Sequence, residues 1–276
     1  MTQDDLSFKR TIQETMLGPL WARAKYSKLY PAILDDKKSH EIIKKIDYDF
    51  TKIEEFLGEW RGIGLLVRAR NFDNAINKFI EKFPQATVIN MGAGLDTTFY
   101  RVDNGTIKWY DLDLPDVIEF RKKYIPEASR CSYISKSALD YKWFNDIEFN
   151  IDKGIFIIAA GFIYYFHESE ISALFGALAK KYPSGEIIFD CVSNLAIKVA
   201  HKRARKAGAE TPFWYIGINN PIKTISKWSD KLKVIDWYTM YARTTLDPKW
   251  NKKTLKMIKM AERFKTAKIV QVKFLK

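Results

Sequence analysis

The sequence predicts an α/β protein with a mostly parallel seven-stranded sheet, helices on both faces of that sheet and a helical cap at the N-terminus. Three observations predict this fold. Apolar residues in roughly the first 80 positions recur at helical spacing, the remainder alternates short apolar segments with helical ones, and a glycine turn directly follows the first apolar segment. Strands that alternate with helices indicate a parallel sheet.

The N-terminal part is expected to be helical. Residues 13–28 mix apolar and charged side chains at helical spacing, and residues 39–46 form a shorter amphipathic segment. Residues 64–83 form the clearest helix, because their apolar side chains recur three and four positions apart and a proline follows at once. We expect residues 1–83 to form a cap packed on a core of residues 84–276.

The core is expected to alternate strands and helices. The segment 154–160 is apolar throughout, as expected of a central parallel strand that is buried on both faces. Strands are expected over residues 87–91, 106–111, 132–135, 154–160, 186–192, 233–241 and 267–274. Helices are expected over residues 115–124, 140–147 and 168–181, after Val192 and between the last two strands. Residues 195–230 are expected to form an insertion over the substrate site, with 211–221 as the lid, because aromatic and flexible residues alternate there.

Composition limits the possible classes of function. Of the 276 residues, 47% are hydrophobic and 29% are charged, as in ordinary globular proteins, and the longest apolar runs are too short for a membrane-spanning helix. The N-terminus lacks the pattern of a signal peptide, so a cytoplasmic protein is expected. Cys131 and Cys191 are far apart and the three histidines are scattered, so we expect free thiols and no metal site.

The net charge of +13 raises the question of an acidic partner. Basic residues are densest at 198–206 and 249–276. A solvated helix face explains these segments better than a nucleic-acid groove, although nucleic acid stays an alternative. We expect a small molecule as the main partner, and the sequence leaves the oligomeric state open.

A glycine turn marks the expected ligand site. Gly92 and Gly94 follow the first expected strand, at the end where ligands bind in open α/β sheets. The dinucleotide fingerprint needs a third glycine where this chain has Thr97, and the phosphate-loop signature does not occur in the sequence. Asp96 would repel a pyrophosphate but suits the cationic sulfonium of S-adenosylmethionine. The turn therefore favours a nucleoside ligand without phosphate.

Two acidic residues follow the second expected strand. Asp111 and Asp113 lie 19 and 21 residues after Gly92, close to the spacing of about 20 at which an acid contacts ribose. An ionised carboxylate only accepts hydrogen bonds, so it can hold both ribose hydroxyls. Alternatively, one of the two acids caps the helix that begins near Pro115.

The motifs resemble a known family. Residues 90–101, NMGAGLDTTFYR, and 110–115, YDLDLP, closely resemble the leucine carboxyl methyltransferase family, in particular its tetracenomycin polyketide O-methyltransferase-like prokaryotic branch. The likeness extends upstream to residues 14–25 and downstream through 158–166 to the last strand. It implies a Rossmann-like class I methyltransferase fold with S-adenosylmethionine as the cofactor.

The resemblance also implies a set of cofactor contacts. Arg68 matches the arginine that holds the cofactor's carboxylate, with Arg70 two residues on, and a basic residue such as Lys25 or Arg23 joins it from the N-terminal segment. Asp113 matches the ribose acid, with Asp111 second. The residues expected to contact S-adenosylmethionine are Lys25, Arg68, Arg70, Gly92, Ala93, Gly94, Asp96, Asp111, Asp113, Leu114, Ser137, Ala138, Ala160 and Gly161.

The chain departs from the family pattern at two of these places. Relatives carry an Asp-Leu pair that reaches the adenine, and the matching positions here are Ser137 and Ala138, with Asp140 as a weaker candidate. After the fourth strand, many relatives carry Glu-Gly or Glu-Cys, whereas this chain has Ala160-Gly161. The contact that the glutamate makes with the cofactor's amino end is therefore missing or replaced.

Methyl transfer is an in-line displacement in which the protein mainly aligns the reactants. A carboxylate acceptor needs no base, whereas a hydroxyl benefits from one. Candidate groups near the cofactor are Tyr164, Tyr165, His167 and Asp190, and we select Tyr165 and His167 as catalytic. Alternatively, the tyrosines form a pocket wall, His167 is a surface turn residue and Asp190 caps a turn.

The expected function is O-methylation of a hydroxyl or carboxylate on a small molecule such as a polyketide-like metabolite. The alternatives are methylation of a protein C-terminal carboxyl group, methylation of nucleic acid, and a non-catalytic cofactor-binding protein. No Asn-Pro-Pro-Tyr-type motif of amino-methylating enzymes occurs in the sequence, which weakens the nucleic-acid alternative.

Overall fold

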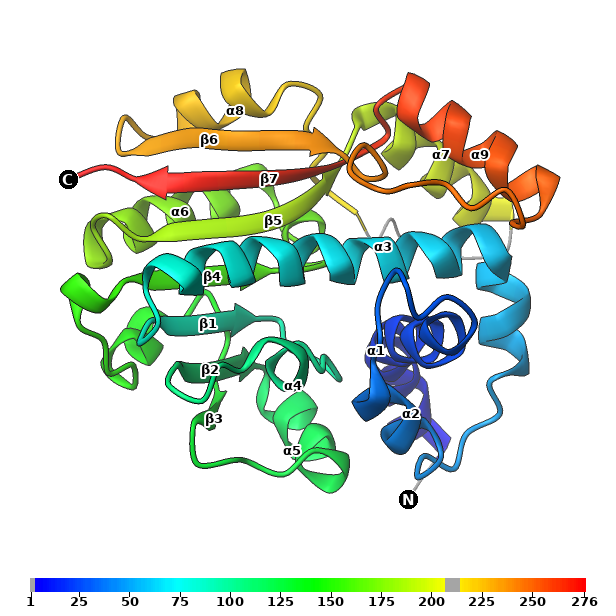
Figure 1. The fold of residues 1–276 in the computed structure, drawn as a ribbon, viewed down its shortest axis with the longest axis horizontal. Helices are drawn as coiled ribbons and strands as arrows, with labels where there is room; N and C mark the ends of the chain where they lie inside the picture. Colours follow the sequence, from blue (N-terminus) through cyan, green and yellow to red (C-terminus); the bar gives the residue numbers. More distant parts are fainter. Residues whose placement is uncertain (1–2, 207–213) are drawn as a thin grey trace.

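The computed structural model describes residues 3–206 and 214–276. A seven-stranded sheet lies at its centre, with helices on both faces (Figure 1). The strand order is β3-β2-β1-β4-β5-β7-β6; β1 to β5 are parallel, and β7 runs antiparallel between β5 and β6. The strands are β1 (Thr87–Met91), β2 (Lys108–Asp113), β3 (Cys131–Ser135), β4 (Ile155–Ala159), β5 (Glu186–Val192), β6 (Leu232–Thr239) and β7 (Ala267–Phe274).

The structure contains most of the helices that the sequence predicts. The helices of the described residues are α1 (Gln3–Leu29), α2 (Lys37–Ile43), α3 (Thr51–Lys82), α4 (Phe99–Val102), α5 (Pro115–Tyr124), α6 (Glu168–Lys181), α7 (Asn194–Lys206), α8 (Pro221–Trp228) and α9 (Lys252–Arg263). Of these, α4 and α8 were not predicted from the sequence. Three short 3-10 segments are η1 (Tyr141–Asn145), η2 (Ile151–Lys153) and η3 (Ile163–Tyr165). In the described residues, no helix is both long and apolar enough to cross a membrane.

Alternate residues of the central strands pack on opposite faces of the sheet. Phe156 and Ile158 of β4 belong to the core that α1, α2 and α3 cover, whereas Ile155 and Ile157 belong to the core on the other face, with α6 and α8. Every residue of β4 is buried, which explains why its sequence is apolar throughout instead of alternating.

The predicted α/β fold is confirmed, with differences at particular boundaries. The expected helix over 140–147 is wrong, because only the 3-10 segment Tyr141–Asn145 forms there. The helix predicted to begin at residue 64 begins at Thr51, and it is interrupted by Gly58 at φ 55°, a left-handed conformation that breaks the helical pattern. The second strand extends to Asp113, two residues beyond the predicted end.

The N-terminal helices lie against the ligand-binding edge of the sheet. Helix α3 runs along one face, and α1 and α2 lie beyond the carboxyl end of β1 (Figure 1). In the expected insertion at 195–230, α8 packs against β6 and α6. Of the predicted lid at 211–221, residues 211–213 lie outside the described residues. The division into a cap and a core stays a prediction.

Candidate cofactor and acceptor site

The glycine turn has the backbone conformation that the sequence requires. Gly92 and Gly94 have φ angles of 68° and 45°, in the left-handed region that favours glycine. The N–H groups of Gly92 and Ala93 donate to the carbonyl of Leu112, at 2.8 and 3.3 Å, which ties the turn to β2. A Cβ atom at Gly92 would lie 2.7 Å from the ring of Phe162, so the glycine permits the ends of β1 and β4 to approach.

Asp113 lies directly beside this turn. Its Oδ2 accepts a hydrogen bond of 2.7 Å from the N–H of Gly94, and its Oδ1 accepts one of 2.8 Å from the N–H of Leu114. Burial raises the pKa of Asp113 to about 6, although these two N–H groups favour the charged form. Each carboxylate oxygen keeps a lone pair that can accept a ribose hydroxyl.

Asp111, the second acid of the pair, is occupied by internal partners. It is fully buried and accepts hydrogen bonds from Asn90 (2.9 Å), from the indole of Trp109 (2.8 Å) and from Arg121 (2.6 Å). These contacts stabilise the protein interior and leave no direction open toward a ligand. Asp113 therefore keeps acceptor positions beside the turn, whereas Asp111 is held by partners in the protein interior.

Arg121 supports the turn from within the protein. Its Nη1 donates to the carbonyl oxygens of Gly94 and Asp96, at 2.9 and 2.8 Å, while Nη2 pairs with Asp111. Sequence reasoning missed this residue, because an arginine in a helix carries no local sign that it will pair across to a buried strand.

Thr97 and Arg101, which follow the glycine turn, join it to the N-terminal helices. The carboxylate of Asp36 has no exposed surface, and its Oδ2 accepts hydrogen bonds from Arg23 (3.0 Å), Arg101 (2.9 Å) and Thr97 (2.6 Å). Arg23 also donates to the carbonyl of Leu95, at 2.8 Å. Arg23 is therefore engaged in a structural network instead of presenting its guanidinium to a ligand.

Asp96 and Lys25 each have partners within the protein. Asp96 accepts from Asn90 (3.3 Å) and from the N–H of Thr98 (3.1 Å). Burial opposes its charge, but Arg23 and other nearby arginines outweigh that effect and lower its pKa. Lys25 pairs with Glu54 of α3 and lies 4.9 Å from the centroid of the Trp21 ring. In the described part of the chain, it does not contact Arg68.

Arg68 forms a cluster with residues from the ends of β4 and β5. Its Nη1 lies 3.4 Å from both the hydroxyl of Tyr164 and the Oδ2 of Asp190. The Oδ1 of Asp190 accepts a hydrogen bond of 2.5 Å from the N–H of Gly161. Arg70 is two positions along the same helix and thus points away from this cluster.

The positions matched to adenine recognition lie near the end of β3. The hydroxyl of Ser137 accepts from the N–H of Leu139 (3.2 Å), and the carbonyl of the buried Ala138 accepts from the indole of Trp143 (3.0 Å). Asp140 is exposed and accepts from the N–H of Lys142 at 3.2 Å, which caps η1. The hydroxyl of Ser137 keeps a donor that an adenine nitrogen could accept.

An aromatic wall continues from the Arg68 cluster. The rings of Tyr164 and Trp214 lie 5.0 Å apart, those of Tyr164 and Tyr165 5.2 Å apart, and those of His167 and Tyr215 4.5 Å apart. The N–H of Tyr215 donates to the carbonyl of Tyr164, at 2.8 Å, which holds the two segments together. Tyr165 and Tyr215 are 39% and 49% exposed, so this aromatic wall faces outward and is available to a ligand.

The strand order arranges these groups along one edge of the sheet. Ser137 and the glycine turn follow β3 and β1, Asp113 ends β2, and Asp190 lies near the end of β5. The strand order reverses at β1 and β4, where open α/β sheets bind ligands. The acceptor-only carboxylate of Asp113 fits a ribose, and the guanidinium of Arg68 fits a carboxylate. In the strand order from β3 to β5, the groups have the chemistry that could hold an adenine, a ribose, a sulfonium and a carboxylate.

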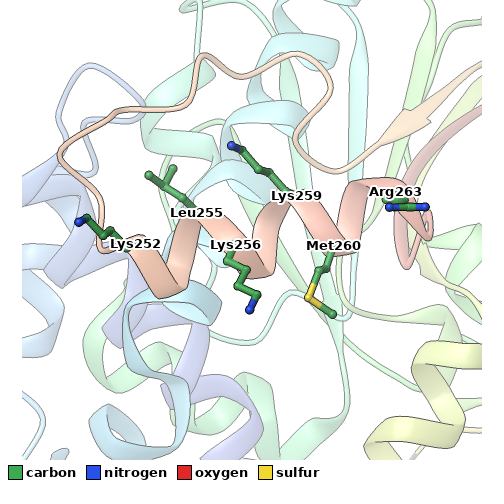
Figure 2. Close-up of a pocket in the computed structure, with 6 residues that line it drawn as sticks. All are labelled: Lys252, Leu255, Lys256, Lys259, Met260 and Arg263. Atoms are coloured by element: carbon green, nitrogen blue, oxygen red, sulfur yellow. The ribbon is translucent and has the colours of Figure 1, made fainter.

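A separate groove lies on the surface of α9. It has a volume of about 470 Å³, and the described residues that line it all belong to that helix: Lys252, Leu255, Lys256, Lys259, Met260 and Arg263 (Figure 2). The basic segment at 249–276 thus includes an exposed helix face, and none of the expected cofactor residues lines the groove. The described residues contain no cluster of potential metal ligands.

Known proteins resemble this chain in sequence and in fold. The model of the leucine carboxyl methyltransferase family matches residues 16–179. The tetracenomycin polyketide synthesis O-methyltransferase TcmP of Streptomyces glaucescens is 30% identical over 212 residues, which cover 76% of each chain. The S-adenosyl-L-methionine-dependent methyltransferase dpfgK of Gibberella zeae is 25% identical over 233 residues, or 77% of this chain and 78% of that protein.

Solved structures with low sequence identity share the fold. A candidate methyltransferase from Thermobifida fusca YX is similar with a TM-score of 0.59 at 11% identity, covering 92% of this chain and 94% of the other. A DUF574 family protein from Streptomyces avermitilis MA-4680 is similar with a TM-score of 0.61 at 11% identity, covering 86% and 97%. With the family match and the 30% identical relative, these findings identify the chain as a class I, S-adenosylmethionine-dependent methyltransferase that belongs to the leucine carboxyl methyltransferase family.

Proposed function

We propose that this chain transfers a methyl group from S-adenosylmethionine to an oxygen atom of a small, flat aromatic molecule, either a hydroxyl or a carboxylate. The observation that best supports this acceptor class is the position of Tyr164. Its hydroxyl contacts Arg68 and Asp190, at 3.4 Å each, while its ring packs against Trp214 in the aromatic wall. The expected methionyl site and a surface suited to aromatic rings therefore adjoin each other.

The printed function of one relative agrees with this class. TcmP is an O-methyltransferase of polyketide synthesis, and it shares 30% identity with this chain over 76% of its length. Helix α7 also carries exposed apolar side chains, with Leu195 49% and Val199 42% exposed. An acceptor that combines an aromatic ring with an oxygen nucleophile would bury these surfaces.

The protein's part in the reaction is mainly to position the reactants. Bound S-adenosylmethionine supplies a methyl group that its sulfonium already activates. Arg68 would hold the methionyl carboxylate and Asp113 the ribose hydroxyls, so that the sulfonium lies over the glycine turn. The aromatic wall would orient the acceptor in line and exclude water, and such alignment can account for a large share of the rate enhancement.

The two neighbouring tyrosines are suited to orient a substrate and not to remove a proton. Burial raises the pKa of Tyr164 well above its ordinary value, and burial also raises the pKa of Tyr165. Both therefore stay protonated near neutral pH. For a hydroxyl acceptor, His167 is the candidate general base, since histidine serves this purpose most often and its ring contacts Tyr215 in the wall.

Transfer of a labelled methyl group to defined acceptors tests the proposal. The panel would contain phenols, aromatic carboxylic acids, aliphatic acids, peptides with a free C-terminus, and RNA and DNA. We expect label in the aromatic oxygen compounds, as alkali-stable ethers or alkali-labile esters. Label found only in peptides or nucleic acid would contradict the proposed acceptor class.

A further inference from the structure

At the methionyl end of S-adenosylmethionine, a positive ammonium group and a negative carboxylate are attached to the same carbon atom. Arg68 offers a guanidinium for the carboxylate, so the ammonium group beside it needs an acceptor close to Arg68. In many members of the family that the sequence resembles, a glutamate after the fourth strand would accept from this ammonium group. This chain has Ala160 at that position. A negative group must come from elsewhere, because an unpaired buried ammonium is costly.

Asp190 is the one carboxylate that contacts Arg68 among the described residues. It belongs to β5, not β4, and it is 4% exposed. The short hydrogen bond from Gly161 N–H to its Oδ1 places the carboxylate directly beside the Ala160-Gly161 turn. Asp190 therefore reaches the position after the fourth strand from the neighbouring strand.

The two oxygens of Asp190 are held unequally. Oδ1 is fixed by the 2.5 Å bond from Gly161, whereas Oδ2 has only 3.4 Å contacts with Arg68 and Tyr164. Those longer contacts are weak, so Oδ2 can accept a stronger, charge-assisted hydrogen bond from a cation. The bond from Gly161 to Oδ1 holds the carboxylate in place, while Tyr164 donates only weakly toward Oδ2.

Gly161 is the residue that makes this arrangement possible. It has a φ of 68°, and a Cβ atom there would lie 2.7 Å from Nη1 of Arg68. A side chain at this position would push the guanidinium away from Asp190. Glycine at this position thus allows the Arg68 guanidinium and the Asp190 carboxylate to lie side by side. A ligand that carries both a carboxylate and an ammonium group requires such a pair.

We propose that Asp190 is the acceptor for the ammonium group of S-adenosylmethionine, and that it replaces from β5 the glutamate that this chain lacks at position 160. The proposal concerns the cofactor and not the acceptor. A wrong acceptor class would therefore leave it, and the binding test below, unaffected.

Calorimetric binding of two ligands tests this proposal. One ligand is S-adenosylhomocysteine, and the other is its des-amino analogue, in which hydrogen replaces the amino group. We expect the wild-type protein to prefer S-adenosylhomocysteine by about tenfold or more, as for a hydrogen bond between charged groups. Asp190→Asn, whose amide oxygen can still accept from Gly161, should bind the two ligands with affinities within about twofold of each other.

The control ligand is 5′-methylthioadenosine, which lacks the whole amino-acid part. Its affinity should be the same for wild type and Asp190→Asn, which shows that the adenosine site is intact. An Asp190→Asn variant that keeps the wild-type preference would overturn the proposal. So would a wild-type protein that binds both homocysteine ligands equally, and this second result needs no variant to fold.

Discussion

Arg121 and Asp111 form an ion pair of 2.6 Å beneath the glycine turn, and each side chain is only 1% exposed. The same guanidinium donates to the carbonyl of Gly94. The pair therefore links the interior of β2 to the backbone that would face the cofactor. Asp111 is one of the two acids whose spacing from Gly92 suits a ribose contact, and it lies wholly inside the protein.

Asp111→Asn should reduce stability without removing the cofactor site. The change leaves a buried arginine without its partner, which costs about 3–5 kcal/mol of the free energy of unfolding. Urea denaturation followed by circular dichroism measures this loss. Under native conditions, the affinity for S-adenosylhomocysteine should stay within about threefold of wild type, a change of less than 1 kcal/mol. A variant that is stable but does not bind the cofactor would assign the ribose contact to Asp111.

Arg68→Ala should weaken cofactor binding by about tenfold or more, because a charge-assisted, two-point contact to a carboxylate is lost. Isothermal titration with S-adenosylhomocysteine measures the effect. Arg70→Ala is the matched control, since it removes the same charge from the same helix on a different face. Equal losses in both variants would indicate a general electrostatic effect instead of a specific contact.

Asp113 should make cofactor binding depend on pH. Burial raises its pKa to about 6, and only the charged form can accept both ribose hydroxyls. The affinity for S-adenosylhomocysteine should therefore fall as pH decreases through about 6. Asp113→Asn should bind about tenfold more weakly at pH 8 and lack this pH step. Asp116→Asn, an exposed neighbour, should keep the wild-type profile.

The raised pKa of Asp113 also predicts that the stability of the ligand-free protein falls as pH rises, whereas its affinity for the cofactor increases. The pKa of Asp113 in the folded protein lies above its ordinary value of 3.8, so its favourable contribution is present below pH 3.8 and is lost as pH rises toward 6. The asparagine side chain of Asp113→Asn has one acceptor oxygen for the N–H groups of Gly94 and Leu114, and this loss does not depend on pH. Between pH 5 and pH 8, the melting temperature of ligand-free Asp113→Asn should therefore rise relative to that of wild type. Scanning calorimetry at both pH values measures the two differences, and a difference that stays constant would contradict the raised pKa.

Asp36→Asn should loosen the N-terminal helices from the glycine turn. Asp36 is fully buried and pairs with Arg23 and Arg101. A neutral side chain removes the ion-pair partner of Arg23 and leaves Arg101 paired with Asp73. We expect a loss of about 3 kcal/mol or more in the free energy of unfolding. The adjacent Asp35 is exposed, and Asp35→Asn should stay within about 0.5 kcal/mol of wild type. Similar losses in both variants would exclude a special role of the network.

The fold was predictable where the sequence pattern is local. Strand β1 at 87–91 and strand β7 at 267–274 have the predicted boundaries, because their residues are mostly apolar and bounded by clear breaks. The start of α3 was not predictable, since Gly58 interrupts the helix in the left-handed conformation. The sequence prediction ended β2 at Asp111, two residues early. A buried carboxylate inside a strand needs a partner, and the partner of Asp111 is Arg121, which comes from a helix further along the chain.

The site was predictable in its motifs but not in its cross-strand contacts. The glycine turn and the spacing to Asp113 can be found in the sequence alone. The contacts of Asp36 with Arg101, and of Asp190 with Gly161, join residues 65 and 29 positions apart, so no local pattern indicates them. The sequence left Asp190 undecided between lining the pocket and capping a turn.

A crystal structure with S-adenosylhomocysteine bound tests the central claim most directly, because the account places each part of the cofactor at a named strand end. We predict the ribose hydroxyls within hydrogen-bond distance of Asp113, the homocysteine carboxylate on Arg68, and its amino group on Oδ2 of Asp190. A ligand bound with its ribose away from Asp113, or at a place other than the carboxyl ends of β1, β2 and β4, would contradict the account.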